Sequence, residues 1–203
     1  MASVAGLLTT GVATLFSALV ARDQLAQSQE VAAEKKREHA ARVSYWVDVL
    51  PDGTPRLHLT NRSTDPISNA IMLFSTYLPD LPDVGFTVKV PSVQPCSDLV
   101  FTSKDMRYST DENQFPPNDY HPFAGRPDAA WLSFDEPPRI DTDWVAFTDR
   151  NGGTWERSGE GILTQRTELD FDQRPGLPGL VLAVQPQSLK ACADAASRVR
   201  PNE

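Results

Sequence analysis

The stretch VSYWVDVLPDGTPRLHLTN, residues 43–61, decides the fold of this chain. Its first part, Val43–Leu50, mixes β-branched and aromatic residues with partial alternation, which predicts a strand. The next four residues, PDGT, favour a tight turn, because proline presets φ and glycine accepts the left-handed conformation. The sequence therefore predicts that a β-hairpin opens the domain.

The second arm of this hairpin covers residues 56–61 and alternates polar and apolar side chains. Side chains two residues apart share one face of a strand, so Leu57 and Leu59 are expected to face a core. The polar residues between them are expected on the solvent side; these are Arg56, His58 and Thr60.

Downstream of the hairpin, short runs of the same kind recur between turn signals. Asn151-Gly152, between two such runs, is a strong hairpin signal. About seven short strands with regular turns predict a mainly β domain, an antiparallel immunoglobulin-like β-sandwich over residues 43–184. The tryptophans expected to supply much of its core are Trp46, Trp131, Trp144 and Trp155. The further predicted strands cover residues 67–78, 84–90, 98–102, 131–134, 140–148, 153–157 and 161–163.

Two segments resemble motifs of a known group of proteins. LHLTNRS, residues 57–63, followed by PI at 66–67, resembles the V-x-N-x-S-x-x-P-I opening of an immunoglobulin-like hairpin. FTD at 147–149, with Gly153, Trp155, Arg157 and GIL at 161–163, resembles F-x-D-x-x-G-x-x-W-x-R-x-x-x-G-x-L, although Gly152 fits that spacing better. Both motifs recur in uncharacterised single-helix β-sandwich proteins of high-GC bacteria. The resemblance implies the architecture and no activity.

Upstream of the hairpin, residues 4–21 (VAGLLTTGVATLFSALVA) carry no charge. Their number is close to the lower limit for a helix that crosses a bilayer. We predict that residues 1–21 form a single transmembrane helix, which contacts membrane lipid through residues 4–21. The alternatives are a secretory signal peptide and a soluble helix packed in a core or an oligomer.

A charged stalk is expected to follow. Residues 22–42 lack proline and glycine and consist mainly of good helix formers, so the helix should continue through them without a break. Their apolar positions are too sparse for the sustained heptads of a coiled coil. A coiled coil, or a homo-oligomer formed through the N-terminal helix, stays open as an alternative.

Charge sets the expected topology. Residues 1–42 carry five Lys or Arg and four Asp or Glu, a net charge of +1. Since the whole chain has a net charge of −8, residues 43–203 carry −9. An acidic domain repels phosphate, which argues against nucleic-acid binding. No basic residue precedes the apolar segment, so the positive-inside rule predicts a single-pass cell-membrane protein with its β-domain in the cytoplasm. Cys96 and Cys192 are then expected to be separate reduced thiols; a disulfide between them is the alternative in an oxidising compartment.

The end of the chain is predicted to change from strand to helix. Residues 177–184 are apolar enough for a last strand. Residues 185–203 are predicted to form a short C-terminal helix and tail, because Leu189, Cys192 and Ala196 fall on one helical face. Pro186 would lie near the start of this helix.

The sequence holds no recognisable catalytic, cofactor or metal motif. G-x-S-x-G and the glycine-rich nucleotide motifs are missing. His39, His58 and His121 are expected to be solvent-exposed, because none stands at ligand spacing with another histidine or cysteine. We therefore expect no enzyme, no cofactor and no metal.

The long segment 103–128 is the best candidate for a functional site, because long loops are typically functional or disordered. Exposed aromatic side chains are favoured interface anchors. The predicted partner-binding residues are Tyr108, Phe115, Tyr120, His121 and Phe123. The alternative is that these side chains hold the loop against the sandwich.

Together these features predict a membrane-anchored, non-catalytic protein whose acidic β-sandwich binds a protein partner. The main alternative is an extracytoplasmic domain that binds a ligand or the cell envelope. An enzyme of unknown type is the third hypothesis.

Overall fold

The computed structural model describes the backbone of residues 2–79, 81–110, 131–167, 177–190 and 192, and the side chains of these residues other than 2–16, 18 and 81. The chain divides into two compact units, residues 1–38 and residues 39–203. Residues 2–38 of the first unit are helical, and the second unit holds all strands of the described residues.

Helix α1 runs without a break from Ala2 to Ala41, as the helix-forming composition predicts. At 1.5 Å per residue its length is about 60 Å. Among the described residues, no helix is long and apolar enough to cross a membrane. The predicted transmembrane helix over residues 4–21 therefore has no support from the structure, and most of its side chains lie outside the described ones. The described part of α1 gives no support to a coiled coil either.

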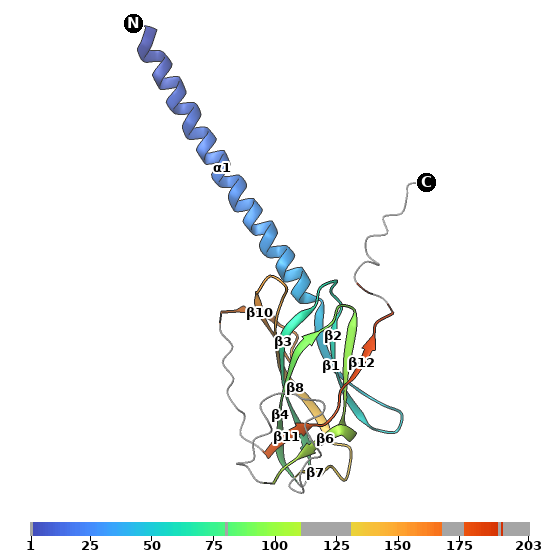
Figure 1. Ribbon diagram of the computed structural model, residues 1–203. Coiled ribbons are helices and arrows are strands. Elements are labelled where there is room, and N and C mark those ends of the chain that lie inside the picture. Colours follow the sequence, from blue (N-terminus) through green and yellow to red (C-terminus); the bar gives the residue numbers. More distant parts are fainter. Residues whose placement is uncertain (1, 80, 111–130, 168–176, 191, 193–203) are drawn as a thin grey trace. The chain divides into compact units, whose positions relative to one another are not determined.

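The first sheet has four antiparallel strands in the order β1-β2-β5-β12 (Figure 1). Its strands are β1 (Val43–Val49), β2 (Pro55–Asn61), β5 (Ser97–Thr102) and β12 (Gln185–Ser188). The predicted hairpin is confirmed, because Val43 pairs with Asn61 and Val49 with Pro55. Gly53 in its turn has a φ of +82°, a conformation that glycine adopts without strain.

The second sheet has eight strands in the order β10-β9-β8-β3-β4-β11-β6-β7. In chain order they are β3 (Ile67–Leu78), β4 (Leu81–Val93), β6 (Met106–Tyr108), β7 (Leu132–Ser133), β8 (Arg139–Thr148), β9 (Thr154–Ser158), β10 (Leu163–Arg166) and β11 (Leu177–Val181). A 3-10 helix, η1 (Ser103–Asp105), precedes β6. Strands β11 and β4 pair in parallel, so the expectation of a wholly antiparallel fold is wrong at this pair.

Side chains from both sheets belong to one buried hydrophobic cluster, so the two sheets share a core. Leu57 and Leu59 of the first sheet lie in it, as the alternation of β2 predicts. On the second sheet, Phe74 of β3 and Phe86 of β4 stack with ring centroids 4.8 Å apart. The chain is therefore mainly β, with one N-terminal helix.

The aromatic core differs from the prediction. Of the four tryptophans only Trp155 is buried, and the other three are half-buried. Trp46 lies across from His58 on the face of the first sheet that points away from Leu57 and Leu59. Phenylalanines fill the core instead: Phe74, Phe86, Phe101 and Phe147 are among the largest fully buried side chains.

The second predicted hairpin, β8–β9, is built around Asp149. Its Oδ1 accepts the backbone N–H groups of Asn151 at 2.8 Å and of Gly153 at 2.9 Å. Its Oδ2 accepts the indole N–H of Trp155 at 2.9 Å. A Cβ at position 153 would lie only 3.0 Å from Oδ2 of Asp149, so glycine suits this close approach. The aspartate, glycine and tryptophan of the second motif thus serve the turn itself.

The C-terminal segment departs from the prediction. Residues 185–188 form strand β12 and not the start of a helix. Pro186 is compatible with this strand because β12 lies at the edge of the sheet, where proline can lack its N–H without loss of a ladder bond. Apart from residues 189, 190 and 192, the rest of the predicted helix lies outside the described residues.

Candidate functional site

The predicted partner-binding loop is partly ordered structure at its start, because residues 103–105 form η1 and residues 106–108 form β6. Tyr108 is 9% exposed and packs on Phe134, with ring centroids 5.0 Å apart. Tyr108 is therefore a core residue, and its assignment as a partner anchor is wrong. The other predicted anchors lie outside the described residues: Phe115, Tyr120, His121 and Phe123.

His58 is buried, at 5% exposure, whereas the sequence predicts a solvent-exposed side chain. It lies on the outer face of the first sheet, as alternation predicts, with Trp46 of β1 and Val100 of β5 across from it. Trp46 covers the imidazole in a parallel stack, with centroids 4.9 Å apart and an interplanar angle of 3°. Alternation along β2 predicts the face correctly; the burial depends on residues of two other strands.

A polar network from three strands surrounds His58. Its Nδ1 lies 2.8 Å from Oδ2 of Asp98. Its Nε2 lies 3.2 Å from Oδ1 of Asp48, without the alignment of a good hydrogen bond. Thr60 donates its hydroxyl to the other oxygen of Asp98 at 2.9 Å. Arg56 donates two hydrogen bonds to Asp48, at 2.9 and 2.6 Å.

This network holds charges in place. The hydrogen bonds from Arg56 lower the pKa of the Asp48 carboxyl, so this side chain stays ionised at a lower pH than a free aspartate does. A serine-protease-like triad requires a hydroxyl that bonds to the imidazole. Here the Thr60 hydroxyl bonds to Asp98 instead, so the described network does not present an activated nucleophile. The network links side chains of β1, β2 and β5 on the outer face of the first sheet, and its partly exposed end is the Asp48–Arg56 ion pair.

Sequence reasoning missed both carboxylates of this network. Asp48 has a sequence signal, because the predicted turn places it directly across from Arg56, and the register confirms this pair. Asp98 has none, because its place beside Thr60 depends on the pairing of β2 with β5, which no local pattern specifies.

Asn61 is the centre of a second cluster, at the end of β2. It is fully buried, and its side-chain amide donates to the carbonyls of Asp65, Val93 and Gln94 at 2.8, 3.2 and 3.2 Å. Its Oδ1 accepts the N–H and the hydroxyl of Ser63, at 3.0 and 2.6 Å. Residues 61–63, which have the N-x-S form of a glycosylation acceptor, therefore make a buried structural turn. It is a poor glycan acceptor, because its amide is enclosed and already bonded.

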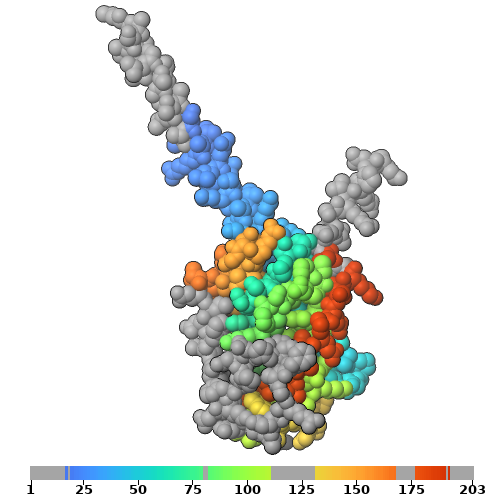
Figure 2. Space-filling view, in the orientation of Figure 1, coloured from blue at the N-terminus to red at the C-terminus, as the bar shows by residue number. Residues whose placement is uncertain are grey.

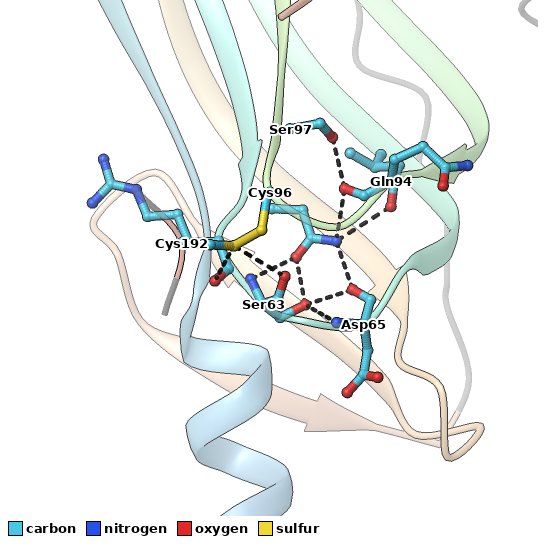
Figure 3. Close-up of a disulfide and its surroundings, with 9 residues drawn as sticks. Ser63, Asp65, Gln94, Cys96, Ser97 and Cys192 are labelled. Carbon is cyan, nitrogen blue, oxygen red and sulfur yellow. Dashed lines mark hydrogen bonds between the residues drawn. A yellow bond between two sulfur atoms is a disulfide. The ribbon is translucent and has the colours of Figure 1, made fainter. Parts of the chain in front are cut away.

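The same cluster carries a disulfide (Figure 3). Cys96, between β4 and β5, is bonded to Cys192, 96 residues later in the chain. The Sγ of Cys192 lies 3.6 and 3.7 Å from the carbonyl oxygens of Arg62 and Ser63. The prediction of two separate reduced thiols is therefore wrong. The two cysteines meet because β12 returns to pair with β5, which the sequence prediction of a C-terminal helix concealed.

A small hollow lies beside this cluster. Its free space is about 10 Å³, room for about one water molecule. Three of its lining residues contact one another: Oδ1 of Asp65 lies 2.8 Å from Nη1 of Arg150, and Oδ2 of Asp65 lies 3.8 Å from Nδ1 of His39. This hollow is too small to hold a substrate or cofactor.

Comparisons with protein-family models, with curated proteins and with solved structures found no match to this chain. The resemblance to single-helix β-sandwich proteins of high-GC bacteria stays a prediction.

Proposed function

We propose that this chain is a non-catalytic binding module that works outside the cytoplasm, an immunoglobulin-like β-sandwich on a helical stalk that residues 4–21 tether to a membrane. The Cys96–Cys192 disulfide carries the proposal. Disulfides persist in oxidising compartments and are rare in the cytosol. This bond favours an extracytoplasmic domain that binds a ligand, a partner or the cell envelope over the cytoplasmic topology.

The charge pattern argues in the other direction. Arg22 and the basic run 35–37 follow the apolar segment, and the positive-inside rule would keep them in the cytoplasm. We give the disulfide more weight, because it requires that the two cysteines of the chain meet across 96 residues. The charge rule is a statistical bias, and the stalk also carries four acidic residues.

The segment between β6 and β7 is the proposed binding surface. Arg107 pairs with Ser133 and Tyr108 with Leu132, so the two ends of this segment are held together at the edge of the second sheet. Tyr108 fastens the first end in the core. A segment closed in this way can present Phe115, Tyr120, His121 and Phe123 to a protein partner, since aromatic anchors dominate such interfaces.

The thiol state in cells tests the compartment. Cells that contain the full-length chain are denatured in maleimide-polyethylene glycol, with and without prior reduction. We expect labelling of both cysteines only after reduction, and labelling of the single remaining thiol without reduction in the control Cys96→Ser. Double labelling of the unreduced chain would place the domain in a reducing compartment and overturn the proposed location.

Alanine substitution tests the binding surface. The combined change of Phe115, Tyr120 and Phe123 to alanine should weaken capture of a partner by several kcal/mol while the thermal melting temperature stays near that of the wild type. The matched control Tyr108→Ala should lower the melting temperature, because Tyr108 is in the core. Unfolding by the triple change would show that these aromatics are core residues and that the partner binds elsewhere.

A further inference from the structure

Strand β12 lies at the edge of the four-stranded sheet, and its strand partner is β5. It has four residues, and all of them are exposed. In Figure 2 the red segment that includes β12 lies at the surface of the domain. Its side chains bury little area, so the non-covalent contacts of β12 are mainly its backbone pairs with β5.

The hydrogen-bonding pattern of this pairing can be assigned. The N–H of Leu189 donates to the carbonyl of Cys96 at 2.9 Å, which marks these two as a hydrogen-bonded pair. Along an antiparallel ladder, hydrogen-bonded pairs alternate with pairs that exchange no hydrogen bond. The next two in the register are Gln187 with Asp98 and Gln185 with Val100. Pro186 falls between them, at a position where the strand donates no N–H to β5.

A covalent bond closes just beyond this strand. Cys192 follows β12 and is bonded to Cys96, which directly precedes β5. Both cysteines are half-buried, and neither belongs to the buried hydrophobic cluster. The turn of Cys96 is also held by other contacts, because Asn61 and Ser97 both donate to the carbonyl of Gln94 (Figure 3). Cleavage of the bond would therefore leave the Cys96 side in place.

We propose that the disulfide is a redox latch on β12. In the oxidised chain it holds β12 against β5. Its reduction releases β12 and opens the edge of β5 to an extended, uncharged peptide segment of a partner. The chemistry of this occupant follows from the strand it replaces, which has no charged residue and bonds through alternate backbone groups. Addition of a strand to a free sheet edge is an established mode of peptide recognition.

The reduction balances with a dithiol as reductant. A thiolate of the dithiol attacks one sulfur, the S–S bond breaks, and a mixed disulfide forms. The second thiol of the reductant then displaces the protein sulfur. Two electrons and two protons pass to the chain, which leaves Cys96 and Cys192 as thiols and the reductant as its own disulfide.

Hydrogen exchange on the purified full-length chain tests the latch. After reduction with dithiothreitol, the amides of Gln185 and Gln187 should exchange at least about tenfold faster, while those of Arg56–Thr60 change much less. A fluorescent peptide of residues 183–189, AVQPQSL, at millimolar concentration should bind the reduced chain and not the oxidised chain. The same peptide with Gln187→Pro, which lacks one paired N–H, is the matched control and should not bind.

Three results would overturn the latch or its open edge. Unchanged protection of β12 after reduction would show that the bond does not hold the strand. An equal loss of protection throughout both sheets would show that the disulfide stabilises the whole domain and not β12 in particular. Release of β12 without binding of the peptide would show that the edge of β5 does not accept a partner strand. Because the chain is purified, these results are independent of the cell compartment and of the surface between β6 and β7.

Discussion

Two hairpin turns of this chain use an aspartate in the same way but in different surroundings. Asp52, between β1 and β2, accepts the N–H of Thr54 at 3.0 Å and pairs with Lys104 at 2.8 Å. Asp149, between β8 and β9, accepts two backbone N–H groups and the indole N–H of Trp155. Asp52 is exposed, whereas Asp149 is buried.

This difference in burial should decide how much each aspartate stabilises the fold. Water can take over the partners of Asp52 when its carboxylate is removed. The hydrogen bond from the indole N–H of Trp155 to Asp149 is buried, and a buried donor that loses its acceptor destabilises the folded state by about 1–3 kcal/mol. Two turns that look alike in sequence are therefore expected to respond very differently to the same substitution.

The largest effect is expected for Asp149→Ala. It leaves the N–H groups of Asn151, Gly153 and Trp155 without their acceptor, so the free energy of unfolding should fall by about 3 kcal/mol or more. Urea denaturation of the full-length chain measures this. Asp149→Asn is the matched control and should lose less, because its carbonyl oxygen can keep part of the bonding. A loss no larger than that of Asp52→Ala would contradict the role given to burial.

A smaller pair of effects should separate space from backbone strain. Gly153→Ala places a Cβ 3.0 Å from Oδ2 of Asp149 and 3.2 Å from Nε1 of Trp155, and should cost about 2 kcal/mol. Gly53→Ala meets no atom within 4 Å but must adopt a φ of +82°, which should cost about 1 kcal/mol. Thermal denaturation of both variants compares them. The reverse order would mean that the Asp149 turn relaxes around the added methyl group.

Sequence reasoning predicts both hairpins because their signals are local. Proline and glycine at the first turn, and Asn151-Gly152 at the second, specify chain reversal without reference to the rest of the molecule. The alternation of residues 56–61 likewise identifies Leu57 and Leu59 as core residues. The long N-terminal helix is predicted for the same reason, since its stalk lacks both glycine and proline.

The remaining features depend on contacts between distant segments. His58 is buried because strands β1 and β5 flank it, and Cys96 meets Cys192 because β12 pairs with β5. Residues 185–188 precede a pattern that favours a helix, but their pairing with the edge of β5 makes them a strand. Alternation, propensity and spacing carry no information about such pairings. Within the candidate site, only the pairing of Asp48 with Arg56 was therefore predictable, because both residues belong to one hairpin.

The smallest effect is expected for Asp52→Ala, and its dependence on salt and pH tests the comparison most directly. The hydrogen bond from Lys104 lowers the pKa of the Asp52 carboxyl, so the contact stabilises the fold above the unfolded-state pKa, about 3.9, and is lost as pH falls through the lowered value. Added salt screens the same exposed pair. The difference in unfolding free energy between wild type and variant should therefore be small at neutral pH, smaller in high salt, and should shrink further in acid. Lys104→Ala is the matched control and should show the same salt dependence. A difference that salt and acid leave unchanged would mean that Asp52 acts mainly through the N–H of Thr54, as a turn cap of the kind seen at Asp149.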